Sequence, residues 1–167
     1  ETLNSQFEKL KAVVAEWLVA DEDITLAQVI GKMLLRSKHT MATAESCTGG
    51  YIAHLITSVA GSSAWFRGTV VSYANEVKEN MLGVQKATLQ TAGAVSEDTV
   101  KQMVSGVIQR MNADYAVTTS GIMGPEGGTN EKPVGTVWIA AGSRSRTVAE
   151  KFHFRYDRAR NIEMSAH

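Results

Sequence analysis

One segment, His39-Thr40-Met41-Ala42-Thr43-Ala44-Glu45-Ser46-Cys47-Thr48-Gly49-Gly50, sets the architecture expected for the whole chain. Small and apolar residues alternate up to Ala44, which is typical of a short buried strand. Polar side chains and two glycines follow, and a helical pattern resumes at Tyr51. A polar turn between a strand and a helix gathers backbone N–H groups and nucleophilic side chains at one point. The turn from Ser46 to Gly50 is therefore open to three interpretations: a phosphate cradle, a turn that presents a nucleophile, or a tight corner.

The bulk composition indicates a soluble, globular, cytoplasmic protein. The chain has 167 residues, 44% of them hydrophobic, which is enough for one well-buried core. Its 17 basic and 17 acidic side chains balance, so the charge gives no indication of nucleic-acid or membrane binding. No apolar run or signal peptide suggests a membrane, and a single cysteine fits a reducing cytosol. Because the chain lacks an initiator Met and stops within a helical pattern, we expect a piece of a longer protein.

Two amphipathic helices are predicted ahead of the first strand, within residues 1–37. Apolar residues at three- and four-residue steps from Leu3 to Leu18 predict the first helix. Thr25 and Gln28 have the spacing of a capping box and open the second helix. We expect both helices only to pack against an α/β core that comprises residues 38–167 and ends in a truncated helix.

Helices and strands alternate beyond the first strand. Further strands are expected at residues 68–73, 114–120, 135–141 and 147–154, and helices at residues 50–60, 75–82 and 96–111 and from Asp157 on. We expect Asn75 to cap the helix that carries Lys78 in its first turn. At that position the helix dipole favours the neutral form of the lysine amine. The Gly- and Pro-rich residues 121–133 are predicted to form a binding loop.

This order predicts an α/β fold, a three-layer α/β/α sandwich with a five-stranded mixed sheet. Right-handed crossovers make the first three strands parallel, the fourth is antiparallel, and the fifth is parallel again. Ser46, Tyr73 and Ser120 each end one of the parallel strands, where ligand sites of such sheets lie. If the first two strands are neighbours, Ser46 and Tyr73 lie about 5 Å apart, with Lys78 one short turn further on.

A serine at this position needs a base before it can act as a nucleophile. None of the histidines is well placed, because His39 lies at the far end of the strand and His153 is late in the last strand. A buried lysine helped by a tyrosine is the alternative, as in Ser-Lys amidases, and backbone N–H groups from Cys47 to Gly50 would bind the oxyanion. Nucleophile-elbow, Walker A, dinucleotide and metal-ligand motifs are absent, so the residues alone favour a hydrolase or transferase without metal or cofactor.

Several motifs in fixed order resemble the C-terminal domain of the CinA family. The similarity extends from about Thr25 to Arg158, and it is carried by the segments Ala44-Glu45-Ser46-Cys47-Thr48-Gly49-Gly50, Gly61-Ser62-Ser63 with Phe66, Tyr73-Ala74-Asn75-Glu76-Val77-Lys78, Gly93-Ala94-Val95-Ser96, Gly121-Ile122-Met123-Gly124-Pro125 with Gly127-Gly128, and Lys132-Pro133-Val134-Gly135-Thr136-Val137. Members of this family include stand-alone bacterial nicotinamide-nucleotide amidases.

The resemblance implies hydrolysis of nicotinamide mononucleotide to nicotinic acid mononucleotide and ammonia in pyridine-nucleotide salvage. It implies that Ser46 is the nucleophile, Lys78 its base and Tyr73 an assistant in proton transfer. The residues expected to bind the substrate, with Arg158 as the candidate for its phosphate, are Thr48, Gly49, Gly50, Asn75, Ser120, Gly121, Gly124 and Arg158.

Two other readings remain open at this stage. Cys47 is a rival nucleophile, because a thiolate is intrinsically stronger than a hydroxyl. Alternatively, the chain is a catalytically silent nucleotide-binding domain of a two-domain CinA protein. The helices before Thr40 resemble the lead-in of such full-length proteins, which points to an upstream domain in the same chain. We expect a homo-oligomer whose partner is a pyridine mononucleotide, with neither nucleic acid nor membrane involved.

Overall fold

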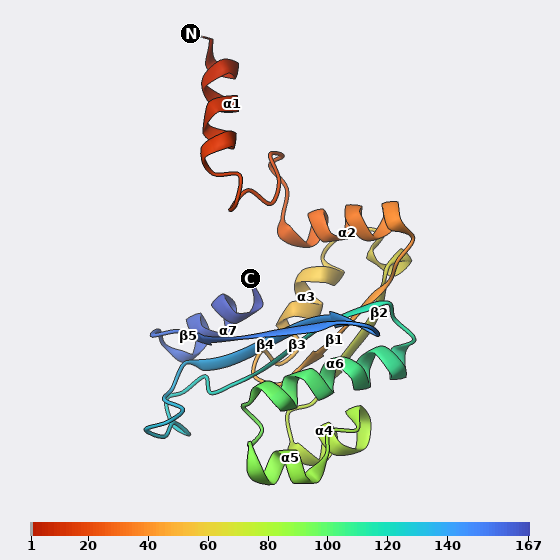
Figure 1. Ribbon diagram of the computed structural model, residues 1–167, viewed down its shortest axis with the longest axis vertical. Helices are drawn as coiled ribbons and strands as arrows, with labels where there is room; N and C mark the ends of the chain where they lie inside the picture. Colours follow the sequence, from red (N-terminus) through yellow and green to blue (C-terminus); the bar gives the residue numbers. More distant parts are fainter. Residues whose placement is uncertain (1) are drawn as a thin grey trace.

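The computed structural model describes residues 2–167, and its centre is a five-stranded mixed sheet (Figure 1). The strand order is β2-β1-β3-β4-β5. The strands are β1 (Met41–Glu45), β2 (Phe66–Val71), β3 (Tyr115–Gly121), β4 (Thr136–Ser143) and β5 (Thr147–His153). β1 pairs in parallel with both β2 and β3, whereas β4 is antiparallel to β3 and β5. The predicted sheet, including its one antiparallel strand, is confirmed.

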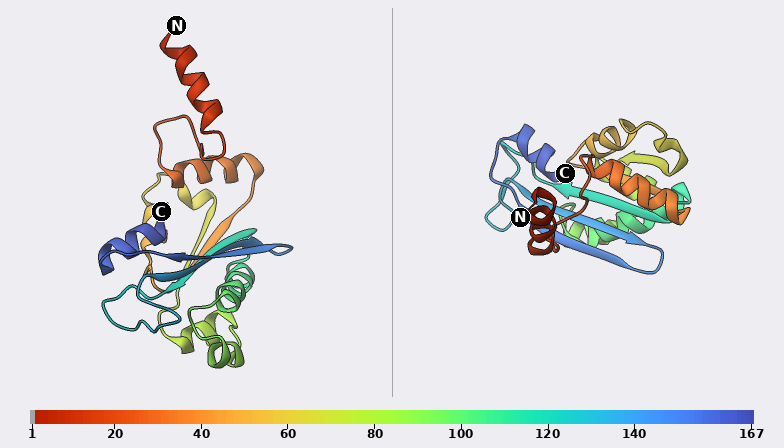
Figure 2. Two further views of the ribbon diagram at one scale, coloured as in Figure 1. Left: turned by 60° about the vertical axis from the view of Figure 1, so that its left-hand side comes forward. Right: turned by 90° about the horizontal axis from the view of Figure 1, so that it is seen from above.

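Helices cover both faces of this sheet, which confirms the three-layer sandwich (Figures 1 and 2). One face carries α4 (Asn75–Leu82), α5 (Lys86–Thr91) and α6 (Glu97–Met111). The other carries α2 (Leu26–Ser37), α3 (Tyr51–Thr57) and α7 (Arg158–Ala166), with a short 3-10 helix, η1 (Ser62–Ala64), before β2. β1 lies in the interior of the sheet, and all five of its residues are buried.

The larger core lies between the sheet and α6. Its buried apolar side chains come from the β1 alanines, from Leu82 at the end of α4 and from the inward stripe of α6. α4 and α6 are in direct backbone contact, because a Cβ atom added at Gly106 would lie 1.9 Å from the Leu82 carbonyl oxygen. This close contact fixes α4, and with it the position of Lys78 relative to the end of β1.

The core on the opposite face is built around Trp65, which is buried with Leu34, Met41, Ile52 and Ile56. The indole fits against α2 because residue 31 is glycine, where a Cβ would lie 2.8 Å from the ring. α2 is therefore packed as predicted, and its capping box is formed by Thr25 and Gln28.

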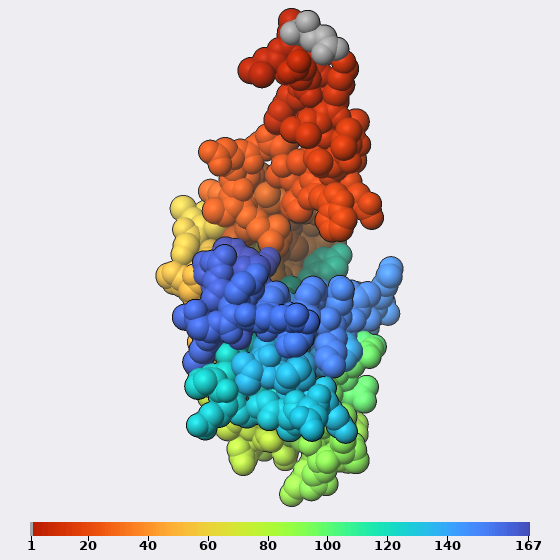
Figure 3. Space-filling model, turned by 90° about the vertical axis from the view of Figure 1, so that its left-hand side faces the viewer, coloured from red at the N-terminus to blue at the C-terminus, as the bar shows by residue number. Residues whose placement is uncertain are grey.

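The first helix departs from the prediction. α1 (Leu3–Val13) buries none of its residues and projects away from the sandwich (Figures 2 and 3). It ends before Trp17 and Leu18, which belonged to its expected apolar stripe and are exposed. The expected packing of this helix on the core is therefore wrong, since an amphipathic pattern defines a face but not what covers it.

Three further differences from the predicted elements lie near the polar ends of the strands. α5 was not predicted. β2 ends at Val71, two residues before Tyr73. The N-cap of α4 is Ala74, and Asn75 is already the first helical residue, without a side-chain capping bond.

Within residues 2–167, no helix is long and apolar enough to cross a bilayer.

Candidate active site

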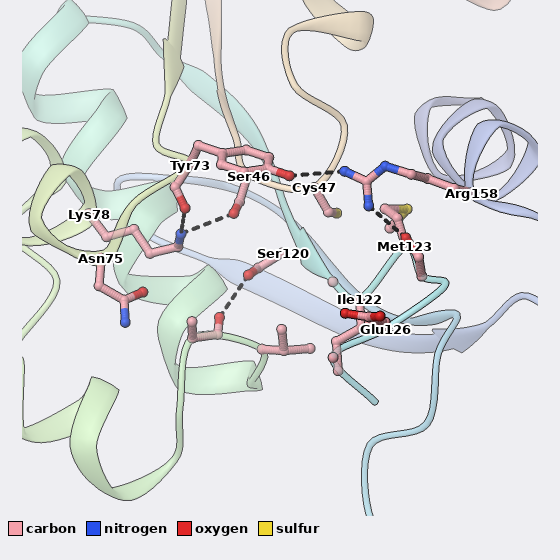
Figure 4. Close-up of a pocket in the computed structure, with 15 residues that line it drawn as sticks. Ser46, Cys47, Tyr73, Asn75, Lys78, Ser120, Ile122, Met123, Glu126 and Arg158 are labelled. Carbon is pink, nitrogen blue, oxygen red and sulfur yellow. Dashed lines mark hydrogen bonds between the residues drawn. The ribbon is translucent and has the colours of Figure 1, made fainter. Parts of the chain in front are cut away.

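A pocket of about 290 Å³ opens at the carboxyl ends of the parallel strands (Figure 4). It lies between the turn after β1, the start of α4 and the loop after β3. The residues that line it are Ser46, Cys47, Tyr73, Asn75, Lys78, Ala94, Val95, Ser120, Gly121, Ile122, Met123, Gly124, Glu126, Gly127 and Arg158. The pocket thus brings together eight of the predicted site residues from segments far apart in the sequence: Ser46, Tyr73, Asn75, Lys78, Ser120, Gly121, Gly124 and Arg158.

The turn that carries Ser46 is held in place by the carboxylate of Glu45. Glu45 is 0% exposed and accepts hydrogen bonds from the backbone N–H groups of Gly50, Ile52 and Ala53 at 2.9–3.1 Å. It also accepts one from the Thr48 hydroxyl at 2.7 Å. These N–H groups are unpaired donors at the start of α3, and the helix dipole favours a negative charge there. The carboxylate therefore caps α3 from inside the protein and fixes the turn between them.

The side chains of Ser46 and Lys78 meet beside this turn. The Lys78 Nζ lies 3.0 Å from the Ser46 Oγ. It also donates to the backbone carbonyl oxygens of Ser72 at 2.6 Å and Tyr73 at 3.4 Å. A neutral amine has two protons for these carbonyls and a lone pair left for the serine hydroxyl. The three neighbours of Nζ thus suit a base that is ready to take the Ser46 proton.

Burial favours the neutral form of this lysine. Lys78 is 1% exposed, and desolvation of its ammonium form lowers its pKa from the ordinary value of 10.5. Coulombic interaction with Cys47 acts in the opposite direction and is the smaller effect. Within residues 2–167, no Asp or Glu forms an ion pair with Lys78. A positive charge on Lys78 would therefore have no carboxylate to compensate it, which is the condition that activates a lysine as a base.

Cys47 is poorly suited to act as the nucleophile. Its side chain is 6% exposed and packs with Met123 and Val137. Burial raises the pKa of the thiol to about 12, chiefly through desolvation of the thiolate. A buried thiol of this kind stays protonated and is inert as a nucleophile at neutral pH.

Tyr73 reaches across the pocket toward Arg158 (Figure 4). The side chain of Tyr73 is 63% exposed, and its hydroxyl accepts a hydrogen bond of 3.0 Å from Arg158 Nη2. The Nη1 of Arg158 donates to the carbonyl oxygen of Gly124 at 2.8 Å. The Tyr73 hydroxyl forms no hydrogen bond with Ser46 or Lys78, because the chain leaves β2 before Tyr73 and turns the phenol outward. The Tyr73 side chain is therefore a partner of Arg158 at the pocket entrance.

Thr48, Gly49 and Gly50 do not line the pocket, contrary to the sequence-based expectation. The Thr48 hydroxyl and the Gly50 N–H are bonded to Glu45, and the Gly49 N–H donates to the Ser46 carbonyl. The predicted oxyanion donors are thereby reduced to two. In the described part of the chain, the N–H groups of Cys47 and Thr48 donate no hydrogen bond to another residue.

The remaining predicted residues form the walls of the pocket. Asn75 is at the start of α4, and the Ser120 hydroxyl donates to the carbonyl of Ala94 at 2.7 Å. Gly121 and Gly124 allow close packing of this loop: a Cβ would lie 2.8 Å from the Thr136 carbonyl oxygen at the first and 2.5 Å from Val134 at the second.

Two acidic residues, Glu45 and Glu126, contribute to the site although the sequence analysis did not predict them as site residues. Glu126 lines the pocket from the predicted binding loop, whose glycines and prolines marked the loop but not this residue. Glu45 fixes the turn, and a carboxylate directly before a helix start was the available signal. Among residues 2–167, no three His, Cys, Asp or Glu side chains lie close enough to hold a metal ion together.

Comparison with known proteins places these residues in context. A family model described as the CinA C-terminal domain matches residues 23–167. The chain is 49% identical to the nicotinamide-nucleotide amidohydrolase PncC of Escherichia coli K12 over 138 residues, which are 82% of this chain and 84% of that protein. It is 44% identical to a CinA-like protein of Cytophaga hutchinsonii over 98% of this chain and only 39% of that protein.

Solved structures agree with the sequence comparison. The competence/damage inducible protein CihA from Agrobacterium tumefaciens superimposes with a TM-score of 0.82 at 40% identity, covering 84% of this chain and 87% of that one. Several relatives are longer: the chain spans 39% of the Cytophaga protein and 36% of a putative competence-damage inducible protein from Halothermothrix orenii. The relatives thus include both long proteins and proteins of nearly the size of this chain.

Proposed function

This chain belongs to the CinA C-terminal domain family, and from that premise we propose that it hydrolyses nicotinamide mononucleotide to nicotinic acid mononucleotide and ammonia. The name of its Escherichia coli relative supports the substrate. The observation that carries the proposal is the 3.0 Å contact between the buried, uncompensated Lys78 amine and the Ser46 hydroxyl.

The first chemical step is attack on the carboxamide. Neutral Lys78 takes the proton of the Ser46 hydroxyl, and the oxygen forms a bond to the carboxamide carbon. The negative charge that develops on the carboxamide oxygen is stabilised by the N–H groups of Cys47 and Thr48, which have no other acceptor in the described chain. Because Glu45 holds this turn rigid, these donors are oriented before the substrate arrives.

The second step releases ammonia. As the tetrahedral intermediate collapses, the C–N bond breaks and protonated Lys78 returns its proton to the departing nitrogen. An acyl-serine remains. Water, deprotonated by the same lysine, then attacks the ester carbon, and the Ser46 oxygen leaves with the proton. The products are a carboxylic acid, which loses its proton to become the carboxylate, and ammonia, which takes up a proton to become ammonium, and Ser46 and Lys78 regain their starting forms.

We assign the phosphate of the mononucleotide to Arg158. Its guanidinium lies at the pocket entrance, where Tyr73 and the Gly124 carbonyl orient it. A planar guanidinium suits bidentate binding of a phosphate group. Tyr73 in this arrangement orients Arg158 and the substrate, a role different from the proton transfer that the family resemblance implies.

Ammonia release from nicotinamide mononucleotide tests the proposal. The wild-type chain should release ammonia, Ser46→Ala should not, and Cys47→Ala should keep turnover within about threefold, because the protonated thiol takes no part in the chemistry. Loss of turnover in Cys47→Ala with an unchanged circular dichroism spectrum would revive the cysteine mechanism. Tight binding of the nucleotide by calorimetry without any ammonia release would instead establish the silent nucleotide-binding domain. The expected homo-oligomer, cytoplasmic location and upstream domain stay predictions.

A further inference from the structure

The pocket divides into a buried end and an exposed entrance with different polar groups. Ser46 and Lys78 lie at the buried end, and Arg158 and Glu126 are exposed at the entrance (Figure 4). Glu126 is the only acidic residue among those that line the pocket. In Figure 4 it lies on the opposite side of the pocket from Lys78.

The carboxylate of Glu126 has no partner within the protein. Among residues 2–167, no hydrogen bond or ion pair involves it, although most charged groups near the site are engaged. An ionised carboxylate only accepts hydrogen bonds. A ligand beside Glu126 must therefore offer donors, which excludes the phosphate, whose oxygens are acceptors and carry the same sign of charge.

The loop that carries Glu126 is anchored on both sides. Before it, the Gly124 carbonyl accepts the bond from Arg158 at 2.8 Å. After it, Lys132 Nζ donates to the Ala92 carbonyl at 2.6 Å, and the Thr129 N–H donates to the Lys132 carbonyl at 2.9 Å. These contacts present the carboxylate to the pocket from a defined position, which a free loop would not do.

The order of the chemical groups along the mononucleotide indicates which of them lies beside Glu126, an inference that rests on the proposed function. The carboxamide must reach Ser46 at the buried end, and the phosphate is assigned to Arg158 at the entrance. The ribose connects the two and carries two hydroxyl donors. Carboxylates bind ribose hydroxyls in the same manner in dinucleotide sites. We propose that Glu126 is a specificity-determining residue that accepts hydrogen bonds from the 2′- and 3′-hydroxyls of the ribose.

Binding measured by calorimetry in a Ser46→Ala background tests this without turnover. The three probes are nicotinamide mononucleotide, its 2′,3′-dideoxyribosyl analogue and the reduced dihydronicotinamide mononucleotide, whose ring is neutral. With Glu126 present, the dideoxy analogue should bind about tenfold more weakly than the natural nucleotide. Adding Glu126→Ala should weaken the natural nucleotide about tenfold and abolish the difference. The matched control is Glu131→Ala on the same loop, outside the pocket, which should preserve the tenfold preference.

The outcomes separate the ribose from other targets. A diol preference that survives Glu126→Ala overturns the inference. A loss of affinity for the oxidised but not the reduced nucleotide also overturns it, because Glu126 would then recognise the charge of the pyridinium ring. If the wild-type chain releases no ammonia but shows the Glu126-dependent diol preference, the proposed function fails and the ribose site stands. If none of the three nucleotides binds, both the proposed function and the ribose site are overturned.

Discussion

The two walls of the pocket differ in burial and in how far their polar groups are hydrogen-bonded within the protein. On one side, the Glu45–Gly50 turn and Lys78 are buried, and almost every polar group is bonded within the protein. On the other side, the loop after β3 is exposed and carries Glu126, which has no partner in the described chain. Burial on the first side lowers the pKa of Lys78, whereas exposure on the second leaves groups free to meet a ligand. We infer that the buried wall performs the chemistry and the exposed wall recognises the substrate.

Removing the lysine from the buried wall should have the largest effect. Lys78→Met eliminates the base, and we expect kcat for ammonia release to fall by about 10³-fold or more. The control is Lys86→Met on the exposed surface of α5, which should retain full activity. A Lys78→Met protein that folds and keeps more than a tenth of the wild-type rate would place the base elsewhere and break the distinction between the walls.

The pH dependence should report the same lysine. Because burial lowers the pKa of Lys78, kcat/KM should rise about tenfold per pH unit up to that lowered pKa and level off below 10.5. In the window between the lowered pKa and 10.5, the unfolded chain binds a proton that the folded chain does not. The free energy of unfolding should therefore increase with pH across this window. Urea unfolding of Lys78→Met at several pH values should lack this increase, and an unchanged slope would contradict the assignment.

Glu45 tests the rigidity of the buried wall. In Glu45→Gln, one carboxylate oxygen becomes an NH₂ group that faces backbone donors, so the start of α3 loses part of its cap. We expect the free energy of unfolding to fall by about 2–4 kcal/mol in urea titrations. Glu150→Gln on the exposed edge strand β5 should change it by less than about 0.5 kcal/mol. Equal effects of the two substitutions would show that the internal cap contributes little.

Arg158 tests the exposed wall, and its effect should be the smallest. Arg158→Ala removes the proposed phosphate ligand, and we expect KM for nicotinamide mononucleotide to rise about tenfold. KM for nicotinamide riboside, which lacks the phosphate, should be unaffected. Arg155→Ala, on the exposed connection after β5, is the matched control. If Arg158→Ala raises KM for both compounds equally, Arg158 supports the loop through Gly124 and does not bind phosphate.

Local signals in the sequence were reliable where the determining contacts are local. The capping box of Thr25 and Gln28 forms as predicted, because it involves neighbours in the chain. The alternation of strands and helices likewise predicted the strand directions in the sheet and the edge at which the pocket lies. The expected cap at Asn75 was wrong by one residue, which is the usual uncertainty of a helix boundary.

Periodicity and turn chemistry were enough to predict the α/β sandwich, the position of Ser46 at the end of a buried strand and the loop that faces it. Which polar groups are left without a partner became clear from the folded chain. Glu45 accepts hydrogen bonds from the N–H groups of Gly50, Ile52 and Ala53, the Tyr73 hydroxyl accepts a hydrogen bond from Arg158, 85 residues away, and burial lowers the pKa of Lys78. The Tyr73–Arg158 bond and the desolvation of Lys78 depend on segments that meet only in the folded chain, so no local pattern could reveal them, whereas Glu45 before a helix start left a local signal.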